Sequence, residues 1–223
     1  MNMLYAYRGW VLGVLAIAML LFPGDPISDV WLSEVLPLSA VLLVSFSILR
    51  IQARRSIGEH TRGFTHDADR LVTEGIYSRI RHPLYLSNGG VGYAFVVLHM
   101  GFQPVALVFV VALFAFEFLL SRLEDRYLEN RFGDEWRKWA AATPAFIPRL
   151  TLGNKTAAPL HPEKVSGESA APLHPEKDCA PAKRSFLSAA RADASTWLWL
   201  AVVVAIIVLR KTVLSFNLLE LLG

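Results

Sequence analysis

The feature that most limits what this chain can fold into is a series of long apolar runs. Four of them, at about 10–22, 31–49, 84–100 and 104–121, are near the length that one helix needs to cross about 30 Å of hydrocarbon. A fifth run lies in the C-terminal segment 196–223. Inside a bilayer a helix satisfies its own backbone hydrogen bonds, whereas irregular chain does not. The sequence therefore predicts an all-α, multi-pass transmembrane helical bundle with four core spans and a fifth hydrophobic helix.

The distribution of basic residues predicts how this bundle is oriented. The connections at 50–81 and after residue 121 are rich in arginine, whereas the short connections at 23–30 and 101–103 contain no lysine or arginine. Because basic loops stay on the cytoplasmic side of a membrane, we expect the two basic segments to face the cytoplasm, at the cell or inner membrane if the protein is bacterial. The charged and aromatic stretch 122–150 is typical of helices that lie at that surface.

The composition divides the chain into three regions. Residues 1–150 form the predicted membrane core. Residues 151–195 are rich in Pro, Ala and Lys and contain Ala-Ala-Pro-Leu-His-Pro-Glu-Lys twice, at 157–164 and 170–177, which favours a disordered linker. Residues 196–223 form the C-terminal hydrophobic helix, either as a full crossing or as a helix lying in the interface.

The composition also argues against several kinds of site and partner. A single cysteine, Cys179, excludes an intrachain disulfide and argues against a cysteine-based metal site. His161 and His174, one in each copy of the repeated sequence, could bind a metal together, but the flanking prolines and the flexibility of such a segment argue against it. The formal net charge is only +3, and no basic run alternates with aromatic residues as in a nucleic-acid-binding surface. We therefore predict no metal site and no nucleic-acid partner.

A cluster of polar residues within 71–86 immediately precedes the third run. Pro83 suits the first turn of a helix, since its missing N–H would be unpaired there. Arg81 and His82 would then lie at the helix entrance, where free backbone N–H groups and the positive end of the helix dipole favour a carboxylate-bearing ligand. Tyr85 follows His82 by three residues and can face the same site. The competing interpretation is a set of ordinary interfacial anchors.

A second cluster, within 117–148, follows the fourth run. If the fourth helix continues beyond the membrane, Glu117, Ser121, Glu124 and Leu128 share one face. Glu117 would lie near the inner end of the span, where a carboxylate must face protein, water or a ligand. A short turn joins the third and fourth runs, so their cytoplasmic ends are neighbours and the two clusters can meet. The competing interpretation is an Arg–Glu pair of purely structural value.

Small residues follow the first cluster along the third run, at Ser87-Asn88-Gly89-Gly90 and at Gly92. Small residues inside a membrane helix usually indicate close packing against another helix. They would equally allow a flat ligand such as adenine to approach the backbone, and the sequence leaves both interpretations open.

The two clusters together resemble the signature of the isoprenylcysteine carboxyl methyltransferase and phospholipid methyltransferase superfamily. In that family, Leu-Val-x-x-Gly-Pro-Tyr precedes Arg-His-Pro-x-Tyr, and Glu-Glu-x-x-Leu-x-x-x-Phe-Gly-x-x-Tyr and Pro-x-Phe-Ile-Pro follow it. The chain carries these motifs as Leu71-Val72, Gly75, Tyr77, Arg81-His82-Pro83-Leu84-Tyr85, Glu124-Asp125, Leu128, Phe132-Gly133, Trp136 and Pro144-Ala145-Phe146-Ile147-Pro148. The resemblance covers roughly residues 40–150, and the chain departs from the motifs at Ile76, Asp125, Trp136 and Trp139.

This resemblance implies S-adenosylmethionine as the methyl donor, bound at the cytoplasmic end of the core. The donor-binding residues that it implies are Tyr77, Arg81, His82, Tyr85, Glu124, Asp125 and Phe132. Among these, the basic residues and Tyr85 are expected to hold the amino-acid part of the donor, and the two acidic residues its ribose or amino group. Tyr77 and Phe132 are expected to flank the adenine or the sulfonium, because aromatic faces attract a cation.

The acceptor implied by the resemblance is a lipid-like or prenylated amphiphile drawn from the bilayer. Carboxyl O-methylation and N-methylation of a phospholipid amine both fit, as does transfer to a small hydrophobic thiol or phenol. Glu117 is expected near the acceptor channel, and His82 or Glu117 is the catalytic base if the acceptor is an amine or thiol. Two other classes stay open, namely a sterol-reductase-like membrane enzyme that uses NADPH and a non-catalytic helical membrane protein.

Overall fold

The computed structural model describes residues 7–57, 70–147 and 185–222, and beyond residue 213 it describes only the path of the last helix. These residues form helices and turns, and no strand occurs among them. The repeated sequence at 157–164 and 170–177, with His161, His174 and Cys179, lies outside the described residues. The prediction of a disordered linker and the question of a metal at the two histidines are therefore left untested.

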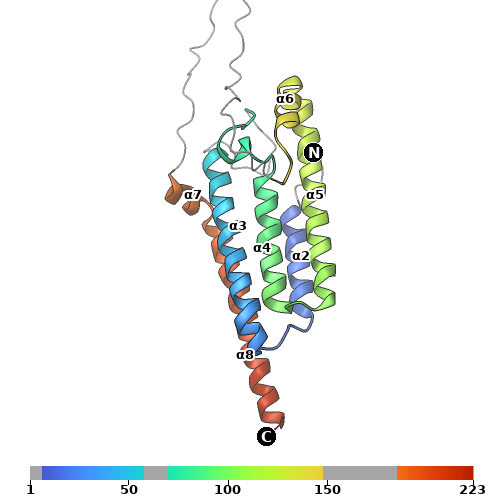
Figure 1. Ribbon diagram of the computed structural model, residues 1–223, viewed down its shortest axis with the longest axis vertical. Coiled ribbons are helices and arrows are strands. Elements are labelled where there is room, and N and C mark those ends of the chain that lie inside the picture. The colour runs from blue at the N-terminus through green and yellow to red at the C-terminus, as the bar shows by residue number, and fades with distance from the viewer. Residues whose placement is uncertain (1–6, 58–69, 148–184, 223) are drawn as a thin grey trace, which may run out of the picture.

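Five long helices pack side by side with alternating direction (Figure 1). They are α2 (Arg8–Leu21), α3 (Leu36–Ile57), α4 (Pro83–Met100), α5 (Pro104–Phe132) and α8 (Ala194–Leu222). The chain enters α3 through a π-helical turn, Trp31–Val35. Helices α2, α4 and α8 run away from the end of the bundle that carries the short helix α6 (Asp134–Ala142), and α3 and α5 return to it. We call this end of the bundle the site end.

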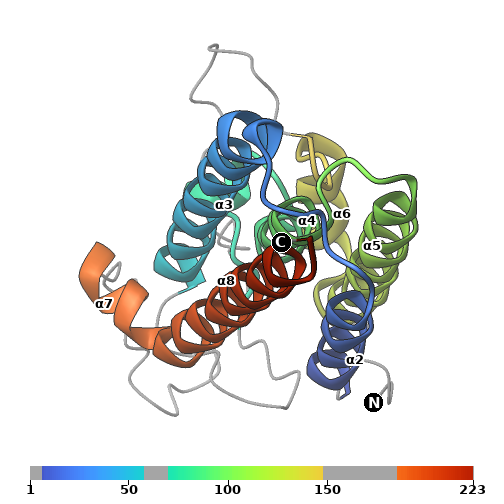
Figure 2. The same cartoon turned by 90° about the horizontal axis from the view of Figure 1, so that it is seen from below.

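Helix α4 occupies the centre of the bundle (Figure 2), and 13 of its 18 residues are buried. Its most extensive contacts are with α3 and then with α5. Its small residues allow this close packing, because a methyl group added at Gly90 would overlap the ring of Phe46 on α3 and one added at Gly92 would overlap Leu113 on α5. Of the two interpretations of the small residues, the structure supports close helix packing.

Among the residues that the structure describes, three helical segments are long and apolar enough to cross a membrane, namely Trp31–Ile57, Pro104–Phe132 and Ala194–Val213. The run predicted to span at 84–100 forms α4, which is not one of the three because polar and small residues interrupt it. The run at 10–22 forms α2, which is apolar but has only 14 residues. The all-helical architecture is confirmed, and the number of spans stays a prediction.

Helix α5 is one continuous helix of 29 residues that joins the apolar fourth run to the charged segment after it. Its buried face includes Phe109, Leu113, Glu117, Ser121 and Asp125. The helix ends at Gly133, whose φ of 54° ends the helical conformation and whose N–H donates to the carbonyl of Glu129 at 2.8 Å. The predicted surface helices at 122–150 are therefore the end of α5 followed by α6.

The C-terminal segment packs against the core at both ends of α8. A short helix, α7 (Phe186–Ala192), precedes it within the range that the sequence assigned to the linker, and Ser185 caps α7 by accepting from the Ser188 N–H at 3.1 Å. At the site end, Asp193 forms ion pairs with two arginines of α3. At the other end, the Lys211 ammonium donates to the carbonyl oxygens of Asp25 and His99. Helix α8 is thus tied to the bundle rather than free of it.

Candidate functional site

A buried basic and acidic cluster lies at the site end, where α4 begins and α5 leaves the apolar part of the bundle. His82 Nε2 lies 2.9 Å from Asp125 Oδ1, and Arg81 donates to Asp125 Oδ2 at 3.2 Å. Both partners of the closer contact are almost fully buried, His82 at 3% and Asp125 at 6% exposure. The predicted meeting of the two sequence clusters is therefore observed, with Asp125 as the acidic partner.

The chain around His82 explains how this cluster is positioned. A 3₁₀ turn, Gly75–Ser78, leads into it, and Gly75 has a φ of 63° that favours glycine. Pro83 then begins α4, as predicted. The backbone N–H groups of Arg81 and His82 donate to the carbonyls of Pro144 and Ala145 at 2.9 and 3.1 Å. These two N–H groups are paired because the segment that follows α6 folds back over the helix entrance.

Helix α6 is joined to the same region by Trp139, whose indole N–H donates to the Tyr77 carbonyl at 3.2 Å. Trp139 is buried, as expected for a side chain that holds two segments together. Tyr77 itself is half-buried in the turn before α4. Helix α6 and the segment after it therefore enclose the cluster from the side opposite the apolar bundle.

Two buried donors in this enclosure have no acceptor among the described residues. They are Arg81 Nε and Trp136 Nε1, and the Arg81 guanidinium lies over the Trp136 ring at 5.7 Å. A buried N–H without an acceptor is costly, about 1–3 kcal/mol. Two such donors beside each other suit an anionic group of a ligand, such as a carboxylate. Asp125, in contrast, is already occupied by Arg81 and His82.

An apolar pocket of about 350 Å³ adjoins this cluster and is lined by Tyr85, Leu86, Phe114, Glu117, Phe118 and Phe146. The His82 ring contacts two of its walls, with centroid distances of 5.7 Å to both Tyr85 and Phe146. His82 therefore lies directly behind the pocket wall, and Glu117 lies within the pocket. His82 and Glu117, the two residues that the sequence predicts to be catalytic, therefore lie beside the same cavity.

Glu117 is the only acidic residue among those lining the pocket, and it is 1% exposed. Neither of its carboxylate oxygens has a hydrogen-bond partner of ordinary geometry among the described residues. The side chain of Asn88, on α4, faces it from one side. Burying a carboxylate is costly unless a cation, a hydrogen-bond donor or a bound proton compensates its negative charge. Its setting therefore points to a ligand group that reaches the pocket.

The structure places Glu124 differently from the prediction. Helical periodicity of 3.6 residues puts Glu124 on the same face as Glu117, but Glu124 is only half-buried and Asp125 is buried in its place. The buried face of α5 advances from Phe109 to Asp125 in steps of four residues. Each such step rotates the face by about 40°, as happens when a helix crosses its neighbours at an angle.

Of the remaining predicted residues, Tyr85 lines the pocket, and Phe132 is the half-buried last residue of α5. The sequence did not single out Trp136 as a donor, Phe146 as a pocket wall or Asn88 as the neighbour of Glu117. Trp136 and Phe146 belong to motifs that the sequence matched, so their positions were marked, but their roles required the fold.

In the described part of the chain, no group of three or more His, Cys, Asp or Glu side chains is arranged to hold a metal ion. The titratable groups of the cluster instead pair with one another or with arginine. The local chemistry is therefore that of hydrogen bonding and charge pairing in a buried polar cluster that adjoins one apolar pocket.

Comparison with known proteins identifies the segment that carries this arrangement. Residues 35–135 match the family model described as phospholipid methyltransferase. Over 131 residues, 53% of this chain and 60% of the relative, the sequence is 29% identical to protein-S-isoprenylcysteine O-methyltransferase B of Arabidopsis thaliana. This segment is therefore similar to the isoprenylcysteine carboxyl methyltransferase and phospholipid methyltransferase superfamily. Helices α3, α4 and α5 are the superfamily core, whereas α7 and α8 lie outside the matched residues.

Two bacterial proteins match a shorter stretch of the chain. The chain is 41% identical over 87 residues to the cobalt-zinc-cadmium resistance protein CzcN of Cupriavidus metallidurans, which is 37% of each protein. It is 40% identical over 87 residues to the nickel-cobalt-cadmium resistance protein NccN of Alcaligenes xylosoxydans xylosoxydans, covering 37% of this chain and 38% of the relative. The chain thus matches less than two thirds of the length of each of these relatives. No solved structure matches it. The match to this family and the three apolar helices found among the described residues together indicate a membrane protein.

Proposed function

We propose that this protein is an integral membrane methyltransferase that transfers a methyl group from S-adenosylmethionine to a lipid-like amphiphile. The observation that carries the proposal is the adjacency of a polar side-chain cluster and an apolar pocket at one end of the bundle. One is polar and holds Arg81, His82, Asp125 and Trp136. The other is apolar and holds Glu117. A donor and an acceptor of opposite character can meet at their boundary.

The residues of the polar volume fit S-adenosylmethionine. The unpaired donors of Arg81 and Trp136 suit the carboxylate of its amino-acid part. Asp125 fixes Arg81 and His82 rather than contacting the ligand itself. Glu124, Tyr77 and Phe132 stay proposed contacts of the remainder of the molecule. When bound, this cofactor supplies a sulfonium methyl group that is already activated for displacement, so the protein's task is alignment and exclusion of water.

The apolar volume suits an acceptor whose tail remains in the bilayer. Its aromatic walls and single buried carboxylate favour an amine headgroup over a carboxylate, because aromatic faces and Glu117 both attract a cation. A second carboxylate placed beside Glu117 in an apolar pocket would be repelled. For a protonated amine, Glu117 would take the proton from the ammonium group, leaving the nitrogen lone pair free to act as nucleophile. His82, behind the wall, would orient Tyr85 and Phe146.

This proposal places the site end of the bundle at the cytoplasmic face of the membrane, in agreement with the basic loops of the sequence. S-adenosylmethionine would enter from the cytoplasm and the amphiphile from the bilayer. The route of the amphiphile agrees with the position of the pocket, which adjoins the apolar part of α5.

The proposal is tested in two stages with the purified full-length protein. Calorimetric titration with S-adenosylmethionine should give saturable binding, whereas affinity for NADPH alone would favour the reductase alternative and affinity for neither would favour a non-catalytic role. Transfer of labelled methyl to extracted host lipids is then measured for the protein and for Glu117→Gln. We expect Glu117→Gln to abolish transfer while donor binding persists.

The matched control for Glu117 is Glu34→Gln, which removes an exposed carboxylate at the opposite end of the bundle. It should leave transfer unchanged. Mass spectrometry of host lipids after overexpression identifies the methylated species that Glu117→Gln fails to make. Equal transfer by Glu117→Gln and by the unmodified protein would refute the assignment of the acceptor pocket.

A further inference from the structure

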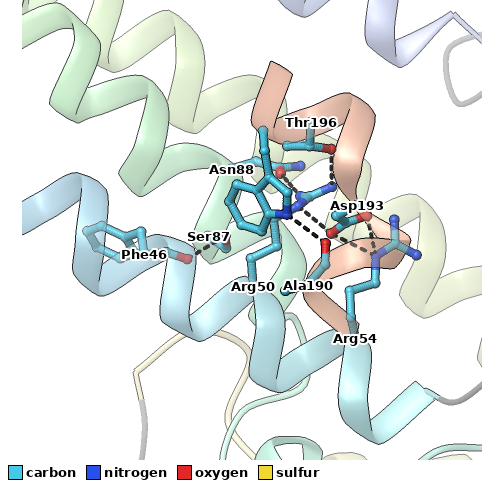
Figure 3. Close-up of polar contacts among 9 residues, drawn as sticks. Phe46, Arg50, Arg54, Ser87, Asn88, Ala190, Asp193 and Thr196 are labelled. Carbon is cyan, nitrogen blue, oxygen red and sulfur yellow. Dashed lines mark hydrogen bonds and ion pairs between the residues drawn. The ribbon is translucent and has the colours of Figure 1, made fainter. Parts of the chain in front are cut away.

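A polar connection leads from the C-terminal segment through the centre of the bundle to Glu117. Its first link is Asp193, which lies between α7 and α8 and is 4% exposed. Arg50 of α3 forms an ion pair with Asp193 at 2.9 Å, and Arg54, one turn further along α3, forms another at 3.1 Å (Figure 3). Thr196, in the first turn of α8, accepts a further hydrogen bond from Arg50 at 3.3 Å.

The second link is the contact between Arg50 and Asn88 of α4. A guanidinium nitrogen of Arg50 lies 2.7 Å from Asn88 Oδ1, as Figure 3 shows. Arginine has only donors, so the Asn88 atom that it contacts must be the carbonyl oxygen. The two N–H donors of the Asn88 amide are therefore turned away from Arg50.

The third link is the one from Asn88 to the pocket. The Asn88 side chain faces Glu117, and the positive charge of Arg50 acts on the same carboxylate. Arg8, on α2, is the other cation whose charge acts on it. Among the described residues, both Glu117 oxygens lack a hydrogen-bond partner of ordinary geometry, and Asn88 is the uncharged side chain that acts on this carboxylate. A carboxylate held at one oxygen presents the other to a ligand.

We propose that Asn88, Arg50 and Asp193 are positioning residues of the acceptor pocket, and that the C-terminal segment thereby completes a site whose other parts lie in the superfamily core. Arg50 fixes the Asn88 amide, and Asn88 directs Glu117 toward the acceptor headgroup. This inference rests on the proposed function. It assigns a role to α7 and α8, which lie outside the residues that match the family model.

The inference is tested by binding of dodecylamine to the full-length protein in nonionic detergent, with Glu117→Gln in the same micelles as the measure of nonspecific partitioning. Dodecylamine carries the amine headgroup and the apolar tail that the pocket suits. We expect Asn88→Ala and Asp193→Asn to weaken dodecylamine binding about tenfold, while the affinity for S-adenosylmethionine changes less than twofold. Asp193→Glu, which keeps the charge, should restore most of the affinity.

Two further variants separate positioning from mere stability or charge. Arg54→Gln removes the second ion pair of Asp193 and leaves the contact between Arg50 and Asn88 in place, so it should change dodecylamine binding less than twofold. Arg50→Lys keeps the positive charge but cannot reproduce the fork that holds Asp193 and Asn88 together, so it should weaken binding as Asn88→Ala does. Thermal unfolding of each variant establishes that it is folded.

The possible results are distinct. Unchanged dodecylamine affinity in Asn88→Ala and Asp193→Asn overturns the inference, even if the donor binds and methyl transfer proceeds. Equal weakening by Arg54→Gln also overturns it, because a structural anchor alone would account for the effect. Dodecylamine binding no stronger than in Glu117→Gln overturns both the inference and the assigned acceptor pocket. Failure to bind S-adenosylmethionine, in contrast, refutes the proposed function.

Discussion

Replacement of Asp125 by asparagine tests the site most directly, because the change removes one charge and almost no volume. Asp125 accepts from His82 at 2.9 Å and from Arg81 at 3.2 Å. Asparagine can accept from one of these donors, but its N–H₂ then faces the other. One hydrogen bond to a charged group is therefore lost and the second is weakened.

The expected size of this effect follows from those two contacts. Hydrogen bonds that involve a charged group contribute about 1.5–3 kcal/mol each. The Arg81 side chain is 14% exposed, so solvent screens its share in part. We expect a loss of about 2–3 kcal/mol in the free energy that holds Arg81 and His82 in place. At about 1.4 kcal/mol for each factor of ten, donor affinity should fall roughly 30- to 100-fold.

The assay is calorimetric titration of S-adenosylmethionine into purified Asp125→Asn and Glu124→Gln. Glu124→Gln is the matched comparison, since it changes the neighbouring residue, removes the same charge and affects a side chain that is only half-buried. Because Glu124 is a proposed donor contact that solvent partly screens, we expect a smaller loss of donor affinity in its variant, about tenfold at most. A larger loss in Glu124→Gln than in Asp125→Asn would show that the donor contacts the residue named by periodicity, and would refute the argument from burial.

Two further predictions concern packing and the second tryptophan. Gly90→Ala should lower the free energy of unfolding by about 1–3 kcal/mol, because the added methyl group would overlap an α3 side chain. The control Gly13→Ala places its methyl group in open space and should cause no measurable change in thermal unfolding. Equal effects of the two substitutions would contradict the close packing of α3 and α4. Trp139→Phe should lower the free energy of unfolding by about 1 kcal/mol, because it loses the hydrogen bond to the Tyr77 carbonyl. Trp136→Phe should leave the free energy of unfolding unchanged and weaken donor binding several-fold in titration, because its indole N–H has no acceptor among the described residues. A loss of stability in Trp136→Phe and of donor binding in Trp139→Phe would contradict the argument from unpaired donors.

The positions of the helices were largely predictable, because a bilayer imposes a length on apolar runs and proline and glycine mark their ends. Pro83, Pro104 and Gly133 lie at helix boundaries in the structure. The buried, central position of α4 was less predictable. Its interior position depends on which helices surround it, and its own hydropathy, interrupted by Asn88 and His99, carries no such information.

The site was predictable as a meeting of two clusters but not in its individual contacts. Arg81 and His82 could be placed at a helix entrance from Pro83 alone. The choice between Glu124 and Asp125 depends on how α5 crosses its neighbours, which a straight-helix periodicity does not include. Arg50 and Asp193 form an ion pair although they are 143 positions apart in the sequence. No sequence motif marks the region around Asp193, so this pair could not be predicted.

The continuity of α5 limits how the two volumes of the site can change. Glu117 and Asp125 are eight residues apart on one unbroken helix, so their separation along the axis is set at about 12 Å by the helical rise. No hinge lies between them. A relative adapted to a different acceptor would therefore have to alter side chains such as Phe114 and Phe118 while leaving the helix in place. Any tilt of α5 would displace the donor anchor and the acceptor carboxylate as a single rigid body.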